Sequence, residues 1–174
     1  MPGKGLIQIY TGEGKGKSTA AFGQALRAAG QGLRVHIIQF FKGEGKSGEQ
    51  VAVKDLPLIQ VEAFGRPGWV NPEAPEAEDK ERARQGLQRA RAIMEEGKVD
   101  LLILDEVNVA LAYGLLSLEE VLELLEGKPE SLEVILTGRG APSRLLERAD
   151  LVTEMREIRH PRQRGIGPRR GIEF

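Results

Sequence analysis

Residues 11–19 read TGEGKGKST, and the fold can be predicted outward from this stretch. An apolar run at 6–10 (LIQIY) precedes it, and a small-residue helical stretch at 20–26 (AAFGQAL) follows it. A strand, a glycine-rich loop and a helix in this order form a phosphate-binding loop, in which backbone N–H groups and the helix dipole face an anion. Lys17 would reach the terminal phosphates and Ser18 a phosphate-bound Mg²⁺. The alternative is a glycine-rich turn that happens to carry lysine, and Thr11 stands where the usual pattern has glycine.

A second motif lies at residues 99–106 (VDLLILDE). Four apolar residues predict a buried strand, and Asp105 and Glu106 follow at its carboxyl end. This is the Walker B pattern, in which the acids hold Mg²⁺ directly or through water. Strands that end in an acid are common, but behind a GKGKST loop the pattern predicts a nucleoside triphosphate bound with Mg²⁺.

The remaining pattern alternates strands with helices, which predicts an α/β fold around a mainly parallel sheet. No linker or repeat interrupts residues 1–174, so a single domain is expected. In the long helix at 76–96, an apolar stripe is expected at Leu87, Ala90, Ile93 and Met94. The predicted helix at 117–126 has a capping box at its start and an expected buried stripe at Leu118, Val121, Leu122 and Leu125. Further strands are expected at 34–40, 58–63, 132–136 and, at a sheet edge, 151–155; shorter helices are expected at 17–29, 49–54 and 108–113 and from Pro142.

Composition narrows the function classes. The 174 residues are 40% hydrophobic and 29% charged, as in ordinary water-soluble proteins. With no cysteine, the chain has no disulfide, thiolate metal site or cysteine nucleophile. A net charge of −1 argues against a broad nucleic-acid surface. No apolar run approaches the roughly 20 residues of a membrane span, and residues 1–4 leave no room for a signal peptide, so a cytoplasmic protein is expected.

Several residues allow two interpretations. His36, inside a predicted strand, is more typical of a buried structural residue than of a catalyst. Lys42 and Lys46 lie on a loop that either faces the ligand or is simply solvated. Trp69, in the Pro- and Gly-rich segment 64–75, either covers a flat ligand or packs into the core.

Two candidate sites follow later in the chain. Arg139, after a predicted strand, either contacts phosphate or bonds loop carbonyls. The arginine-rich tail at 156–174 either binds an anionic ligand or RNA, or closes over the active site. His160 would then serve in that lid, or be merely exposed.

Taken together, these segments resemble a known family. YTGEGKGKSTAAFGQALRAAG, QFFKG, LLILDEVNVALAYGLLSLEEVLELL, VILTGRGAPSRLLERADLVTEM and the closing RGIEF are similar to the single-domain P-loop ATP:corrinoid adenosyltransferases. The resemblance covers nearly the whole chain. It implies a RecA-like P-loop fold, use of ATP and Mg²⁺, and transfer of the 5′-deoxyadenosyl group of ATP to the Co(I) of a reduced corrinoid, with release of triphosphate. It also implies a cytoplasmic homodimer supplied with electrons by a flavin-type reductase.

The resemblance also assigns roles to individual residues. It places a catalytic lysine at Lys17 and a catalytic acid at Glu106, which forms the Mg²⁺ group with Ser18 and with Asp105 nearby. Trp69 matches a tryptophan beside the corrinoid, and Arg27 matches a position near the adenosine. The expected cofactor-binding set, for ATP and the corrinoid together, is Gly12, Glu13, Gly14, Lys15, Gly16, Lys17, Ser18, Thr19, Arg27 and Trp69.

This chain departs from the family pattern at several points. The family often has asparagine at the position of Glu13, and phenylalanine two positions before the tryptophan, where Pro67 stands. That phenylalanine helps exclude the lower axial ligand of cobalt. The tail GIGPRRGIEF differs from the commoner form, and no N-terminal arm precedes the first strand.

The implied chemistry needs no protein nucleophile, because Co(I) is itself strongly nucleophilic. The residues must hold ATP in line and neutralise the charge on the departing triphosphate. Two other functions fit the motifs alone. One is a generic P-loop ATPase or small-molecule kinase, and the other is a nucleotide-dependent regulatory or RNA-binding module that uses the arginine tail.

Overall fold

Six parallel strands form one open sheet in the order β3-β2-β4-β5-β1-β6. The computed structural model describes residues 3–43, 47–66, 70–71 and 73–173. The predicted α/β fold with a parallel sheet is confirmed, and so is the edge position of the last strand. The strands are β1 (Ile7–Thr11), β2 (Val35–Gln39), β3 (Ile59–Ala63), β4 (Leu101–Asp105), β5 (Glu133–Thr137) and β6 (Leu151–Glu154).

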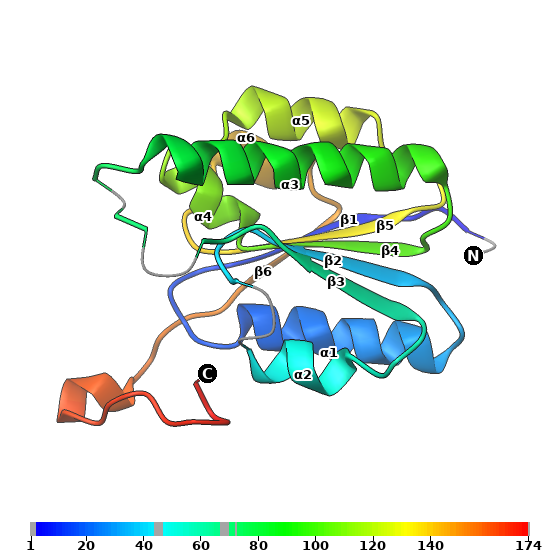
Figure 1. Ribbon diagram of the computed structural model, residues 1–174. Coiled ribbons are helices and arrows are strands. Elements are labelled where there is room, and N and C mark those ends of the chain that lie inside the picture. Colours follow the sequence, from blue (N-terminus) through cyan, green and yellow to red (C-terminus); the bar gives the residue numbers. More distant parts are fainter. Residues whose placement is uncertain (1–2, 44–46, 67–69, 72, 174) are drawn as a thin grey trace.

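Helices cover both faces of this sheet (Figure 1). On one face lie α1 (Lys17–Gly30) and α2 (Gly48–Val53). On the other face lie α3 (Ala77–Glu96), α4 (Val107–Ala112), α5 (Leu118–Glu126) and α6 (Ser143–Arg148). Within the described part of the chain, no helix is both long and apolar enough to cross a membrane.

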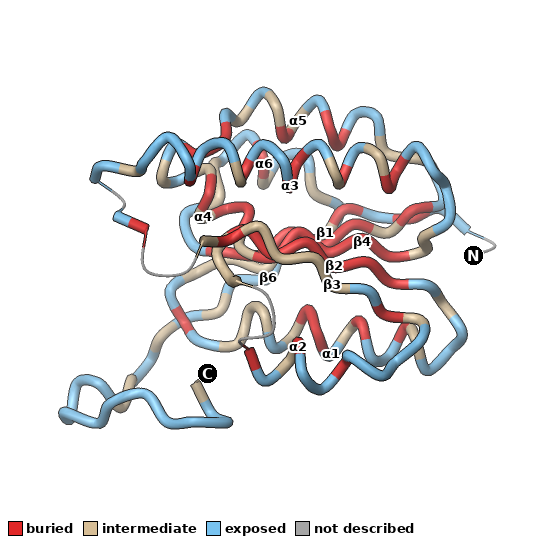
Figure 2. Tube along the Cα trace, viewed as in Figure 1, coloured by how far each residue is buried: buried red, intermediate tan, exposed pale blue. Residues whose placement is uncertain are grey.

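The central strands are buried on both sides, as Figure 2 shows in red. Along β4, Leu102 and Leu104 join the cluster under α3 and α5, while Leu101 and Ile103 join the cluster under α1. A strand that contributes to two cores must be apolar at every position, which explains the unbroken LLIL run in the sequence.

The buried face of α5 differs from the sequence-based expectation. Val121 and Leu125 are buried as expected, but Leu124 is 1% exposed, whereas Leu118 and Leu122 are only partly buried. The helix is therefore rotated so that Leu124 faces the core. The expected stripe of α3 is confirmed, since Leu87, Ala90, Ile93 and Met94 are all buried.

His36 lies in the middle of β2 and is 2% exposed, which confirms its burial inside a strand. Its Nε2 lies 2.8 Å from the Glu62 carboxylate on β3, and that carboxylate also pairs with Arg89 on α3 at 2.7 Å. Burial lowers the pKa of His36, and the neighbouring Glu62 only partly opposes this. The histidine is thus a structural neighbour of the Glu62–Arg89 ion pair.

The tail after β6 turns back toward the start of α1 (Figure 1). It contains a short 3₁₀ helix at Pro161–Arg164, and most of its residues are exposed (Figure 2). Its last described residues lie near the phosphate-loop end of the sheet. This places segments from both ends of the sequence around one region.

Candidate active site

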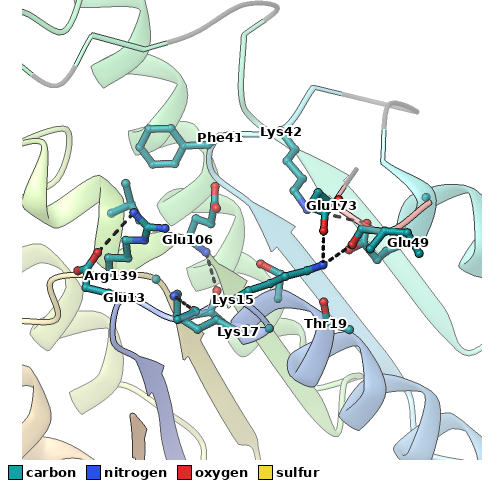
Figure 3. Close-up of a pocket in the computed structure, with 18 of the residues that line it drawn as sticks. Glu13, Lys15, Lys17, Thr19, Phe41, Lys42, Glu49, Glu106, Arg139 and Glu173 are labelled. Atoms are coloured by element: carbon teal, nitrogen blue, oxygen red, sulfur yellow. Dashed lines mark hydrogen bonds and ion pairs between the residues drawn. The ribbon is translucent and has the colours of Figure 1, made fainter. Parts of the chain in front are cut away.

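A pocket of about 830 Å³ opens at the carboxyl ends of the strands, where open parallel sheets bind their ligands. It lies between the loop after β1, the ends of β4 and β5, the start of α2 and the returning tail (Figure 3). Its lining comprises Glu13, Gly14, Lys15, Gly16, Lys17, Ser18, Thr19, Phe41, Lys42, Gly48, Glu49, Ala52, Val70, Glu106, Val109, Tyr113, Thr137, Gly138, Arg139, Glu157, His160, Gly171, Ile172 and Glu173.

The glycine loop is packed against the end of β6. The Gly14 N–H donates to the Met155 carbonyl at 2.6 Å. A Cβ on Gly12 or Gly14 would come within 2.5 Å or 2.7 Å of that carbonyl oxygen, so no larger residue fits. Gly16 has φ 115° and caps α1, which allows the loop to turn directly into the helix.

Lys17 is the first residue of α1, and its ammonium closes the glycine loop. Its Nζ donates to the carbonyls of Gly12 at 2.6 Å and Gly14 at 2.7 Å. Burial lowers the pKa of Lys17, and the positive charge of Arg139 lowers it further. The side chain is therefore held where it borders the pocket.

Glu106 caps α4 and lines the pocket, and Figure 3 shows its side chain beside that of Arg139. Its φ of 66° is the only positive φ at a non-glycine position among the described residues. Burial raises the pKa of Glu106, and the charge of Asp105 raises it further. The carboxylate makes no hydrogen bond or ion pair with any described residue, so it can accept a ligand. Such strained, partly buried acids are typical of functional sites.

Asp105 lies behind the pocket wall. It is 1% exposed, and its two carboxylate oxygens accept hydrogen bonds from Gln39 and Thr137, each at 2.8 Å. Its bonded neighbour Thr137 and the next residue, Glu106, line the pocket, whereas Asp105 itself does not.

Each of three further cations of the pocket has an acidic partner. Lys15 on the glycine loop donates to the Glu173 carboxylate at 3.1 Å and to the Ile172 carbonyl at 2.6 Å (Figure 3). Two similar pairs complete the set: Arg139 with Glu13 at 3.4 Å, and Lys42 with Glu49 at 3.9 Å.

The loop that carries Arg139 is fixed by α4. The Asn108 side-chain amide donates to the Gly138 carbonyl at 3.2 Å, and Gly138 has φ 130°. A Cβ on Gly138 would approach the Val109 nitrogen at 2.9 Å, so glycine is needed for this contact. Arg139 thus projects from a well-packed turn.

An apolar wall faces the cationic part of the pocket. Phe41 and Tyr113 pack edge to face with ring centroids 5.6 Å apart, and Val70 and Val109 also line the pocket. The pocket therefore combines an anion-binding end with a surface suited to a flat or apolar group.

Most of the residues predicted from the sequence meet in this pocket. Glu13 to Thr19 and Glu106 line it, while the backbone of Gly12 and the side chain of Asp105 support it. Arg27 does not line it: it is exposed in the last turn of α1, ten residues beyond Lys17, or about 15 Å along a helix. Trp69 and Lys46 lie outside the described residues.

Sequence reasoning missed several residues of this site. Gln39 and Thr137 end the strands on either side of β4, and Ile172 and Glu173 come from the tail. A polar residue at the end of an apolar strand was a usable signal for the first two. The sequence offered closure over the active site as one interpretation of the tail, but it did not single out Ile172 or Glu173, and Glu173 is 158 residues from its partner Lys15.

The donor set suits a metal ion that also binds phosphate. In the described part of the chain, no group of three or more His, Asp or Glu side chains could hold a metal by itself. Mg²⁺ usually takes only one or two protein ligands and completes its shell with water and phosphate oxygens. Ser18 and the Glu106 carboxylate both border the pocket and fit that requirement.

Comparison with known proteins adds an independent finding. The profile of the family described as ATP:corrinoid adenosyltransferase BtuR/CobO/CobP matches residues 3–174. The chain is 38% identical to the corrinoid adenosyltransferase of Escherichia coli K12 over 174 residues, which cover 98% of this chain and 86% of the relative. It is 35% identical to the corrinoid adenosyltransferase of Pseudomonas aeruginosa, over 98% of this chain and 84% of that protein. It is 37% identical to the corrinoid adenosyltransferase CobA of Salmonella typhimurium, over 98% and 86%.

Proposed function

The chain belongs to the ATP:corrinoid adenosyltransferase family, and we propose that its pocket binds Mg²⁺ and ATP with the triphosphate on residues 12–18. It is an enzyme that transfers the adenosyl group of ATP to a corrinoid. The observation that supports the binding mode is the pocket itself. One opening joins the glycine loop, the Glu106 carboxylate, which pairs with no residue in the described part of the chain, and the aromatic pair Phe41 and Tyr113.

The glycine loop would bind the triphosphate. Its backbone N–H groups and the positive end of α1 favour an anion at this position. Lys17 would exchange its two loop carbonyls for phosphate oxygens, and Lys15, Lys42 and Arg139 lie within the same pocket. These groups would stabilise the charge that develops on the triphosphate as it leaves.

The reaction balances without a protein nucleophile. The electron pair of Co(I) forms the Co–C bond to C5′ while the C5′–O bond breaks, and that bonding pair leaves with the triphosphate. The protein must hold C5′, cobalt and the departing oxygen in line. It must also keep water from the strongly reducing metal of the substrate. The apolar side of the pocket would serve this second purpose.

Ser18 and Glu106 would hold Mg²⁺, with Asp105 behind them. When bound there, the metal would neutralise part of the negative charge of the triphosphate. Glu106 and Ser18 line the same pocket, which supports this shared role.

The proposal extends to the partners and setting of the enzyme. Residues 1–174 would act as one domain in a cytoplasmic homodimer. A flavin-type reductase would supply the electron that converts Co(II) to Co(I). Trp69 would lie against the corrinoid. Arg27 does not line this pocket, so it would contact the adenosine only if the adenosine extends beyond the pocket.

A product analysis tests the proposed function. The protein is mixed without oxygen with ATP, Mg²⁺ and chemically reduced cobalamin, while the cobalt absorption bands and the phosphate products are followed. Loss of the Co(I) bands, a light-sensitive Co–C product and intact triphosphate are expected. Unchanged corrinoid with accumulation of ADP and phosphate would instead indicate an ATPase and contradict the proposal.

A further inference from the structure

Three neighbouring strands of the sheet end in buried polar side chains beneath the pocket. Gln39 ends β2, Asp105 ends β4 and Thr137 ends β5, and none is more than 1% exposed. The strands are adjacent in the sheet, and Gln39 pairs directly with Asp105 in the register of β2 and β4. Buried polar groups are costly unless they bond to one another, so this row must form a network.

Asp105 is the centre of that network. Its Oδ2 accepts from the Gln39 side-chain amide and its Oδ1 from the Thr137 hydroxyl, both at 2.8 Å. Two neutral donors thus solvate a buried carboxylate and fix its orientation. Both carboxylate oxygens of Asp105 therefore already accept hydrogen bonds from the side chains of neighbouring strands.

Thr137 carries the network on to Glu106. Its Oγ1 accepts a hydrogen bond from the Glu106 backbone N–H at 2.9 Å. That bond holds the one described non-glycine residue with a positive φ, 66°, a conformation that persists only where its surroundings enforce it. The same backbone turn directs the Glu106 carboxylate into the pocket (Figure 3).

Gln39 carries the network in the other direction, to the loop before α2. Its Oε1 accepts from the Gln50 side-chain amide at 2.6 Å, and that amide also donates to the Gly43 carbonyl at 3.2 Å. Gly43 directly follows Phe41 and Lys42, which line the pocket. One chain of hydrogen bonds therefore links two walls of the site.

We propose that Gln39 and Thr137 are positioning residues that hold Asp105 as a fixed anchor and thereby orient Glu106 toward the metal bound with ATP. This inference rests on the proposed Mg²⁺ site. Asp105 acts through its two bonded neighbours, and Glu106 is the acid that meets the ion. Partners that orient metal ligands from behind typically change metal affinity about 10-fold to 100-fold when they are removed.

The test compares Thr137→Val with Thr137→Ser by measuring ATP affinity calorimetrically, with Mg²⁺ and with a chelator, in the absence of corrinoid. Valine keeps the shape of threonine but removes both hydroxyl hydrogen bonds, whereas serine retains the hydroxyl. The ratio of ATP affinity with Mg²⁺ to ATP affinity with chelator is expected to be about tenfold smaller in Thr137→Val than in the wild type. The ATP affinity measured with chelator is expected to stay within about twofold of wild type. Thr137→Ser is expected to keep the Mg²⁺ effect. Thr153→Val, on the exposed edge strand β6, is the matched control and is expected to change neither affinity.

Gln39→Met provides a second variant if thermal unfolding shows that Thr137→Val does not fold. It is expected to reduce the Mg²⁺ effect in the same way, because Asp105 then keeps only one donor. A folded Thr137→Val or Gln39→Met protein with the full wild-type Mg²⁺ effect overturns the positioning role and leaves the metal site intact. If the ATP affinity of the wild-type protein is the same with and without Mg²⁺, the proposed metal site is contradicted, and the positioning role falls with it.

Discussion

Replacing Lys17 with methionine removes a charge from the glycine loop while keeping nearly the same side-chain length. In the structure this charge is held by two hydrogen bonds, to the carbonyls of Gly12 and Gly14 at 2.6 Å and 2.7 Å. The ammonium closes the loop in this structure, and in the proposed complex it would face the triphosphate. Lys17→Met should affect both stability and reaction rate, and the two losses are expected to differ in size.

The loss in stability is expected to be the smaller effect. Hydrogen bonds from a charged donor contribute about 1.5–3 kcal/mol each when well buried. Lys17 is only partly buried, and burial already lowers its pKa, so the two bonds together should contribute about 2 kcal/mol. For a chain of this size, that loss lowers the melting temperature by about 4–8 °C.

The loss in rate should be larger. Removing one group that stabilises the developing charge typically slows a reaction about 10²- to 10³-fold, which corresponds to about 2.7–4 kcal/mol. Lys17→Met should therefore remain folded at 25 °C and still form the Co–C bond at least about a hundredfold more slowly.

The assay follows loss of the Co(I) absorption at saturating ATP, alongside thermal unfolding of the same samples. Lys54→Met is the matched control, because Lys54 is exposed just beyond α2 and does not line the pocket. A folded Lys17→Met enzyme within threefold of the wild-type rate would refute the reasoning, since the transition state would then not depend on this charge.

Three further outcomes are expected. The lowered pKa of His36 means that the folded protein binds a proton there less readily than the unfolded chain does. The free energy of unfolding should therefore fall as the pH drops below about 6.5 and level off below the pKa of the folded state. Urea titrations at pH 7 and pH 5 should show that this fall is smaller in His36→Gln than in the wild type. Leu124→Ala should cost about 2–5 kcal/mol in the same titrations, against less than about 1.5 kcal/mol for the partly buried Leu122→Ala, and equal losses would contradict the orientation of α5. Glu173→Gln should weaken the hold of the tail on Lys15 and tighten ATP binding about twofold to fivefold by calorimetry, whereas weaker ATP binding would mean that the tail supports the nucleotide.

The two motifs could be interpreted from the sequence because each depends on local structure. A glycine loop with lysine between a strand and a helix favours phosphate binding by its backbone, and the unbroken LLIL run is typical of a strand buried on both faces. The pocket residues 13–19 and Glu106 followed from these local rules.

The orientation of α5 could not be determined in this way. Its sequence LEEVLELLE places leucine or valine at five of nine positions, so the apolar arc is wide enough for two rotations about 100° apart. Packing against α3 and the sheet chooses the one that buries Leu124. Similarly, the role of Gln39 depends on β2 lying beside β4 in the sheet. The sequence of a strand does not reveal which other strand will pair with it.

The charge pairs of the pocket explain how it remains stable before ATP arrives. Lys15 meets Glu173, Lys42 meets Glu49 and Arg139 meets Glu13, while Lys17 bonds to loop carbonyls. A set of cations gathered for a triphosphate would repel itself if each lacked a counter-charge, and here carboxylates supply that charge. In the proposed complex, ATP would therefore replace these carboxylates with phosphate oxygens rather than meet unpaired positive charges. The exchange reduces net affinity, but it favours a ligand whose several charges can displace the carboxylates together. A triphosphate meets that condition better than a monophosphate, because it carries more negative charges along a longer chain.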